Sequence, residues 1–221
     1  MTDDAWEALH QFWSPLGDPT ERVYLPFLLL SLAVTVALYR GDVRRAVRDL
    51  LWPGQRLGSL TLDGQMYLVR QSLRLMGVAL DTGLSWAIAL SLLQFLTEIL
   101  GRHDAAYGQF GVVLFTMILF VLWDLSRYVV HRIMHEVPWL WAFHQVHHNA
   151  EAMTPLTFYR IHPVESLIYQ ARGIVVTGVT TGACAWWFGA DITQMTFLGI
   201  NAFVFGLHAF TGNLRHSHVA L

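Results

Sequence analysis

The chain of 221 residues lacks lysine and contains a single cysteine, Cys184. One cysteine cannot form an intrachain disulfide, and it argues against zinc or iron–sulfur sites built from thiolates. We interpret Cys184, which lies in the apolar run GACAWW, as a small packing residue. All fourteen basic residues are arginine and the net charge is −2, so no polybasic surface for nucleic acid is indicated.

Charged residues of either sign are also scarce. They make up 14% of the chain, whereas soluble domains have about 25%. Hydrophobic residues make up 54%, and several runs are long enough to cross a bilayer, which takes roughly 20 residues. The composition therefore predicts an integral membrane protein, and the length suggests one domain or at most two small ones.

Five mainly apolar runs are candidates for transmembrane helices. They are Val23–Tyr39, Gly77–Leu96, Tyr107–Trp123, Gly173–Ala190 and Ile192–Phe210. The third is expected to continue as a helix through Asp124 and Arg127, and the short break at Asp191 suggests that the last two form a tight helical hairpin. The acidic N-terminus lacks the basic region of a signal peptide, so the first run is interpreted as a retained span. The predicted fold is an all-α membrane protein with about four to five transmembrane helices.

Arginine is concentrated between the first two of these runs. The positions are Arg40, Arg44, Arg45, Arg48, Arg56, Arg70 and Arg74. Cytoplasmic loops are enriched in basic residues, so this connector is placed in the cytoplasm and the N-terminus outside. Counting spans forward then places the histidines from His131 to His218 in a helical cap on the cytoplasmic side, with His208 just inside the membrane edge. The membrane would be a bacterial inner membrane or its equivalent.

Histidine is the abundant polar residue in the C-terminal part of the chain. Nine of the eleven histidines follow residue 130, and five lie in the run HRIMHEVPWLWAFHQVHH. His131 and His135 are four residues apart, so on a helix they share a face. In HQVHH the spacing i, i+3 and i+4 again places at least two imidazoles on one face. Pro138 ends or kinks the first helix, so the pattern predicts two short helices whose histidine faces meet at a metal site.

Carboxylates available to such a site are few. Only four follow Asp124, namely Glu136, Glu151, Glu165 and Asp191. Carboxylate-bridged di-iron bundles need several Glu and Glu-x-x-His pairs, which are absent, and Trp139 stands where H-E-x-x-H needs its second histidine, which excludes a zincin. Imidazole suits zinc, copper, iron and nickel alike. About eight histidines exceed the three or four ligands of one zinc ion, so two metals are suggested.

The run from Asp124 to Pro163 contains H-R-I-M-H, H-Q-V-H-H and R-I-H-P in that order. This order resembles the fatty acid hydroxylase / sterol desaturase superfamily, and N-L-R-H-S-H within Asn213–Val219 is similar to one of its branches. The resemblance implies a catalytic domain at residues 77–221, preceded by a span and a basic connector at residues 1–76. It implies a di-iron enzyme that uses O2 to hydroxylate or desaturate a C–H bond of a fatty acyl, sterol or related lipid.

The resemblance also implies a set of metal ligands. Carried over residue by residue, these are His131, His135, His144, His147, His148 and His216. His218 is a further candidate in the same segment as His216. His162, in R-I-H-P, is either a ligand or a residue near the site, and His208 faces either the site or the membrane interface. The family closes its site with a further H-x-x-H-H box downstream, whereas this chain ends at Leu221. We therefore expect either a truncated sequence or an incomplete ligand shell with weak or no activity.

Asp124 is a candidate catalytic residue because it precedes His131 by two helical turns. A carboxylate in that position can accept the second N–H of a ligand histidine and so fix its tautomer. The alternative is a helix-end charge paired with Arg127 or Arg132, and both remain open.

The absence of cofactor motifs bears on the partners of the protein and on its alternative functions. No flavin, haem or iron–sulfur motif is visible, so a separate electron-donor protein or reductase is implied. Aromatic residues near the boxes form either a slot for the lipid or an interfacial belt: Trp139, Trp141, Phe143, Phe158 and Tyr159. Two other functions stay open, a membrane haem-binding electron carrier and a metal transporter.

Overall fold

The structure is a computed structural model that describes residues 14, 16–18, 24–38, 57–103, 107–150, 157, 159–189, 196–197 and 200–207. Their regular elements are helices, apart from β1 (Thr196–Phe197) and β2 (Ile200–Asn201), which pair as a two-stranded ladder. The chain divides into two compact units. The first comprises Met1–Gln71, His147–Arg160 and Phe197–Leu221, and the second comprises Ser72–Val146 and Ile161–Thr196.

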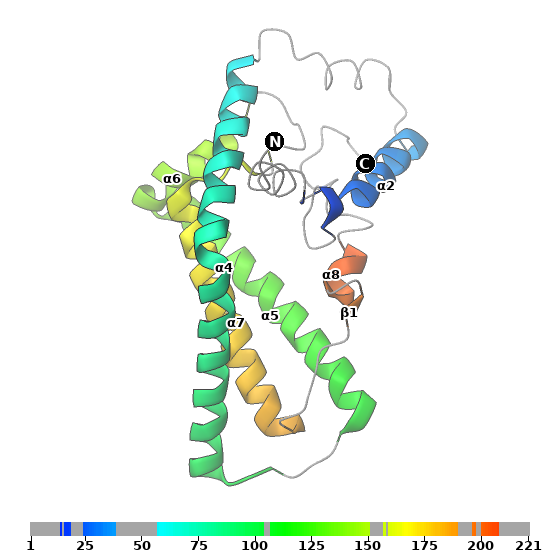
Figure 1. Cartoon of the computed structure of the whole chain (residues 1–221), viewed down its shortest axis with the longest axis vertical. Coiled ribbons are helices and arrows are strands. Elements are labelled where there is room, and N and C mark those ends of the chain that lie inside the picture. Colours follow the sequence, from blue (N-terminus) through cyan, green and yellow to red (C-terminus); the bar gives the residue numbers. More distant parts are fainter. Residues whose placement is uncertain are drawn as a thin grey trace, which may run out of the picture. The chain divides into compact units, whose positions relative to one another are not determined.

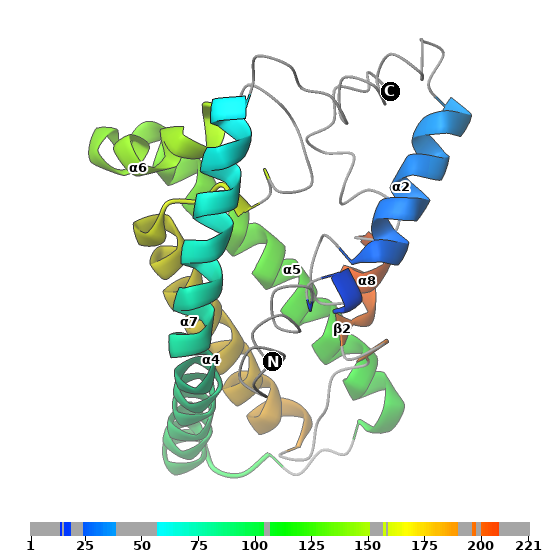
Figure 2. The same ribbon diagram turned by 45° about the horizontal axis from the view of Figure 1, so that its top comes forward.

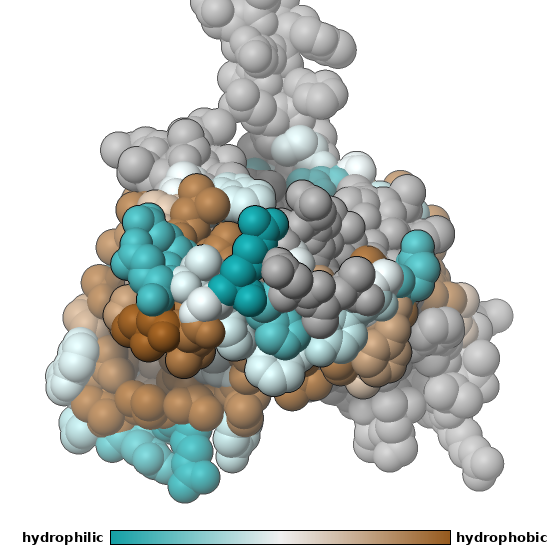
Figure 3. Space-filling model, turned by 90° about the horizontal axis from the view of Figure 1, so that it is seen from below, coloured by the Kyte–Doolittle hydropathy of each residue, from teal (hydrophilic) through white to brown (hydrophobic). Residues whose placement is uncertain are grey.

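Two helices are long and apolar enough to cross a membrane. Helix α4 (Leu57–Leu100) contains the candidate span Gly83–Leu100, and α5 (Gly108–Glu136) also contains an apolar stretch of sufficient length. Large apolar side chains on both helices are exposed, among them Leu90 and Val121. Apolar side chains also cover much of the described surface at the end where α4 stops and α5 begins (Figure 3). Extended apolar surface of this kind marks contact with lipid or with another protein, and the two helices suggest membrane association.

These two spans match the second and third predicted runs, and α5 continues unbroken through Asp124 and Arg127 as expected. Within the described ranges no other helix meets the same criterion of length and apolarity. The first predicted run holds α2 (Leu25–Leu38), whose 14 described residues are fewer than a span needs. The fourth, Gly173–Ala190, overlaps α7 (Pro163–Phe188) as far as Phe188. The predicted domain boundary at residues 76 and 77 falls inside α4, which is continuous there.

The predicted hairpin partner Ile192–Phe210 is not one continuous helix in its described part, and this expectation was wrong. The stretch contains β1, β2 and the six-residue helix α8 (Ala202–Leu207). The Asn201 side-chain oxygen accepts a hydrogen bond from the backbone N–H of Phe203 at 3.1 Å. Asparagine in this position satisfies a free N–H of the first helical turn and favours a helix start. The chain therefore starts a new short helix at this point.

Helices α5 and α7 pack against each other in the second unit (Figure 1). Phe115 and Leu119 of α5 form a core with Cys184 and Phe188 of α7, so the interpretation of Cys184 as a packing residue is confirmed. Nearer the other end of the pair, the Arg172 guanidinium donates to the Trp123 carbonyl oxygen at 2.9 Å. Apolar contacts and this hydrogen bond together align α7 with α5.

Glycines on α7 allow α4 to approach closely. A Cβ at Gly178 would lie 2.7 Å from the Ile88 Cβ and 2.9 Å from the Ser85 carbonyl oxygen. A Cβ at Gly182 would lie 2.6 Å from the Ala89 carbonyl oxygen. Real Cβ atoms do not fit at such distances, so these two glycines set the spacing of the helices, as small residues do in membrane-helix packing.

The proline between the two histidine groups breaks the helix as predicted. Helix α5 ends at Glu136, Val137 is extended, and α6 (Pro138–His148) begins with the proline. Proline suits the first position of a helix because its missing N–H would have no partner there. The sequence predicted two short helices, but only α6 is short. His131 and His135 lie instead near the end of the long helix α5. In Figure 2, α6 lies at the end of the bundle where α5 stops and α7 starts.

Candidate metal centre

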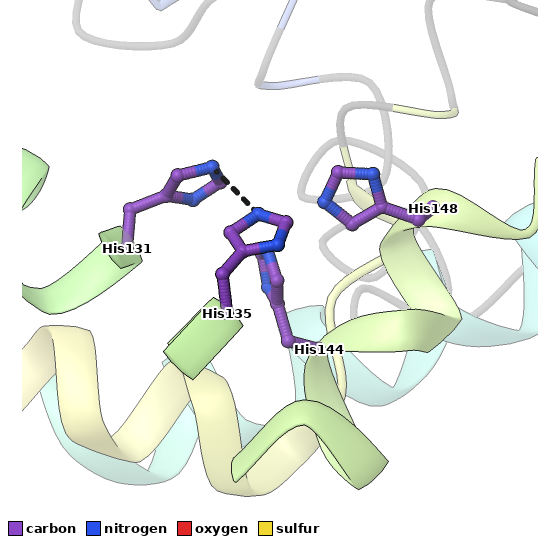
Figure 4. Close-up of side chains that lie close together, drawn as sticks. All are labelled: His131, His135, His144 and His148. Carbon is purple, nitrogen blue, oxygen red and sulfur yellow. Dashed lines mark hydrogen bonds between the residues drawn. The ribbon is translucent and has the colours of Figure 1, made fainter. Parts of the chain in front are cut away.

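Four histidines from two helices converge at the junction of α5 and α6. His131 and His135 lie one turn apart near the end of α5, and His144 and His148 lie one turn apart on α6. One ring nitrogen from each of the four lies within 4.8 Å of the others (Figure 4). The i, i+4 spacing places each pair on one helix face, and the turn at Pro138 brings the two faces together.

The spacing of these nitrogens suits a metal ion. Two nitrogens that each lie about 2.0–2.1 Å from one ion are separated by about 3–4 Å, depending on the angle at the metal. The Nε2 atoms of His131 and His135 are 3.3 Å apart, which is within that range. The limit of 4.8 Å for the whole group needs only a small inward movement of the rings. The four side chains therefore fit a site of neutral imidazoles, and the arrangement can hold one ion or part of a two-metal centre.

A buried carboxylate lies behind one of these histidines. The His144 Nδ1 is 2.9 Å from the Oε1 of Glu165, and the two side chains are 1% and 4% exposed. With Nδ1 bonded in this way, Nε2 is the nitrogen that His144 presents to a metal. A carboxylate on the far nitrogen holds the ring in one tautomer and orientation, which is the usual support for a ligand histidine.

The environment of Glu165 is unusual for a carboxylate. It lies in the first turn of α7, and burial raises its pKa to about 7. Its second oxygen is buried and has no hydrogen-bond partner among the described residues. Glu165 is one of the four acidic residues that follow Asp124, and the sequence pattern predicted no role for it. The one signal for Glu165 in the sequence was its position two residues after R-I-H-P. A helix that starts at this proline holds Glu165 beside the histidine motifs.

His147 is not one of the four grouped histidines, although its ring lies next to that of His148, with 5.5 Å between centroids. It is three residues after His144, so its ring leaves α6 in a different direction from those of His144 and His148. Its Nδ1 is 3.3 Å from the Arg160 carbonyl oxygen. A ring that donates from Nδ1 to a backbone carbonyl presents Nε2 for coordination. The ligand role implied for His147 thus remains a prediction, and the structure shows what would orient the ring.

His162 lies at the start of α7 as its capping residue. Its backbone is extended, Pro163 follows in the first helical position, and its Nδ1 accepts a hydrogen bond from the Val164 N–H at 3.2 Å. The ring also contacts Phe143 of α6, with 4.8 Å between centroids. His162 therefore joins α6 to the start of α7 near the candidate site, and whether it binds a metal remains a prediction.

Asp124 is exposed on α5, two turns before His131. One of its two predicted basic partners, Arg132, is paired instead with Glu136 at 2.7 Å. Asp124 was predicted to accept the second N–H of a ligand histidine. Glu165 makes a contact of this kind with His144. Asp124 keeps its candidate role only as a prediction.

The remaining candidates divide between described and undescribed residues. His208, His216, His218 and Phe158 lie outside the described residues. Trp139 is exposed, Trp141 lies beside His135 with 5.2 Å between centroids, and Tyr159 is buried against Tyr67. Tyr159 therefore belongs to a packed core, and the slot or belt predicted for the aromatic residues does not include it.

Comparison with known proteins agrees with the resemblance found in the sequence. Residues 116–219 match the model of the fatty acid hydroxylase family. The matched segment contains the four converging histidines as well as Glu165. No curated protein and no solved structure matches the chain.

Proposed function

We propose that this chain, whose residues 116–219 match the fatty acid hydroxylase family, is a membrane-bound oxidoreductase that uses O2 to hydroxylate or desaturate a C–H bond of a fatty acyl, sterol or related lipid. The observation that carries the proposal is the group of four histidines with ligand atoms within 4.8 Å of one another. Because the group lies inside the matched segment, the family and the geometry point to the same residues.

The residues that would hold iron follow from this geometry. His131, His135, His144 and His148 would bind one ion, and His147 and His216 would contribute to a second, with His208 and His218 as further candidates. When bound, the iron ions supply the activation of O2 and the oxidation of the C–H bond. The chain itself orients the ligands. Glu165 holds the Nδ1 of His144, and the Arg160 carbonyl oxygen does the same for His147.

The position of the site along α5 suits a lipid substrate. Helix α5 begins at Gly108, and a hydrocarbon core of about 30 Å takes about 20 residues of helix. If the core begins at Gly108, His131 and His135 lie just beyond its opposite edge, at the depth of the lipid headgroups. Both a lipid and a water-soluble electron donor reach that depth. The arginine-rich connector supports a cytoplasmic position for this edge, in a protein that we propose has about four to five spans.

The test is metal content combined with product analysis. Purified protein is expected to contain iron and, with a reductase or chemical reductant, to consume O2 and form an oxidised lipid that mass spectrometry identifies. Stoichiometric zinc without lipid oxidation would overturn the proposal. A Soret band would support the haem-binding alternative, and metal movement into vesicles without O2 consumption would support the transporter.

A further inference from the structure

A fully buried ion pair lies in the first compact unit. The Arg160 Nε donates to the Asp63 Oδ1 at 2.5 Å, and the side chains are 1% and 0% exposed. Asp63 lies near the start of α4, before the candidate span Gly83–Leu100 and before the matched segment 116–219. A charge so far from solvent is costly unless its partner and hydrogen bonds are complete, so the other contacts of the pair decide its role.

The remaining polar atoms of the pair join three segments of the chain. One terminal nitrogen of Arg160 donates to the carbonyl and hydroxyl oxygens of Ser59 at 2.6 and 2.8 Å, and the other donates to the Asn149 carbonyl oxygen at 2.9 Å. The Thr157 hydroxyl donates to the second carboxylate oxygen of Asp63 at 3.0 Å. A planar guanidinium with several fixed donors suits such a junction, and lysine would not replace it.

This junction is connected directly to the histidines at the end of α6. Asn149, which receives one Arg160 hydrogen bond, follows His148 in the chain. The carbonyl oxygen of Arg160 itself lies 3.3 Å from the His147 Nδ1. The side chain of Arg160 therefore fixes the segment whose main chain orients His147, and Asp63 fixes Arg160.

We propose that Asp63 and Arg160 are positioning residues for the metal centre. They hold the last turn of α6 and keep the His147 ring oriented with Nδ1 toward the Arg160 carbonyl oxygen, so that Nε2 is the nitrogen that would coordinate a metal. The inference rests on the proposed function, and it extends the working centre to a residue of α4 outside the matched segment. Supporting residues of this kind typically change metal affinity by about 10–100-fold.

The experiment uses the full chain, purified without metal in detergent and titrated with Co²⁺, whose absorption bands report the number and geometry of its ligands. Asp63→Asn keeps the shape of the side chain and removes its charge. We expect Co²⁺ affinity to fall by about tenfold or more, with altered bands. The matched control is Glu136→Gln, which removes one charge from the exposed Arg132–Glu136 pair and is expected to change neither quantity, since exposed pairs contribute little.

Two further variants separate positioning from stability. Thr157→Val removes one hydrogen bond and leaves both charges, so it tests the same junction if Asp63→Asn does not fold, and we expect a smaller loss of affinity. The double variant Asp63→Leu/Arg160→Met removes both charges together, which often preserves folding. A folded double variant with weak Co²⁺ binding supports the positioning role.

The outcomes distinguish this inference from the proposed function. Wild-type affinity and bands in folded Asp63→Asn, or in Thr157→Val when Asp63→Asn does not fold, would overturn the inference and leave the proposed function standing. Wild-type affinity in the folded double variant would show that the pair serves stability alone, which also overturns the inference. Absence of metal binding by the wild-type chain would overturn both.

Discussion

The second unit has histidine beside tryptophan at both of its ends, at the junction of α5 and α6 and again at the residues that follow α4. The two ends differ in chemistry. At the junction of α5 and α6, the ring centroid of His144 lies 4.7 Å from that of His131 and 4.8 Å from that of His135, and Glu165 contacts the His144 Nδ1. At the other end a single histidine, His103, stacks on Trp187, with 5.0 Å between ring centroids and 19° between the ring planes.

The difference lies in what surrounds each imidazole. His103 contacts the rings of Tyr107, Trp186 and Trp187, and the Trp186 Nε1 donates to the Gly101 carbonyl oxygen at 3.0 Å. Tryptophan and tyrosine gather at membrane–water interfaces, where an apolar ring and one polar atom are both satisfied. A histidine among such rings is a packing group, whereas a ligand site needs several nitrogens that converge. Four predictions test this contrast.

The largest effect is expected from removing one imidazole at each end. His135→Ala should lose its iron and reduce lipid oxidation by more than about 100-fold, beyond the 10–100-fold typical of residues that only support ligands. His103→Ala should keep both iron and activity. Metal analysis and product formation, compared at equal protein amounts, check the pair. Equal losses in the two variants would mean that the contrast is wrong.

The second prediction concerns the carboxylate behind His144. Glu165→Gln should weaken metal binding by about 10–100-fold, because the amide cannot hold the His144 Nδ1 proton as a carboxylate does. Co²⁺ titration measures this change. Glu98→Gln is the control at the other end, where an exposed carboxylate accepts a hydrogen bond from Gln94 at 2.9 Å, and it should bind Co²⁺ as the wild type does.

The third prediction concerns the helix packing that connects the two ends. Gly182→Ala places a Cβ 2.6 Å from the Ala89 carbonyl oxygen and should destabilise the protein by about 1–3 kcal/mol through overpacking. Gly83→Ala on α4, where a Cβ meets nothing within 4 Å, should be neutral or stabilising by up to about 1 kcal/mol. Thermal unfolding in detergent compares the two, and equal melting temperatures would contradict the close contact.

The smallest effect is expected at the aromatic end. Trp186→Phe removes the hydrogen bond to the Gly101 carbonyl oxygen and should cost about 1 kcal/mol of stability. Its iron content and lipid oxidation should not change. A loss of metal in this variant would show that the two ends are coupled, and the contrast would have to be abandoned.

Local features of the site were readable from the sequence. Three such features are the shared helix face of His131 and His135, the break at Pro138 and the continuation of α5 beyond its apolar run. Each depends on neighbours within about two helical turns. The same reasoning failed at Ile192–Phe210, where hydropathy alone suggested a helix and the capping side chain of Asn201 starts a new one.

Long-range partners could not be predicted in this way. Glu165 meets His144 across 21 residues, and Asp63 meets Arg160 across 97. Both acids were visible in the sequence, but no periodicity or spacing links them to their partners. Asp124, chosen because it was near in sequence, is exposed instead.

The sequence by itself determined which residues could bind a metal and on which helix faces they lie, because helical periodicity and the sterics of proline act between neighbours. Only the tertiary structure decided that His148 and not His147 joins the cluster with His144, and that a buried carboxylate stands behind it. Those choices depend on how α5, α6 and α7 pack. Packing decides which polar groups are buried, and a buried polar group must find its partner wherever the fold places one.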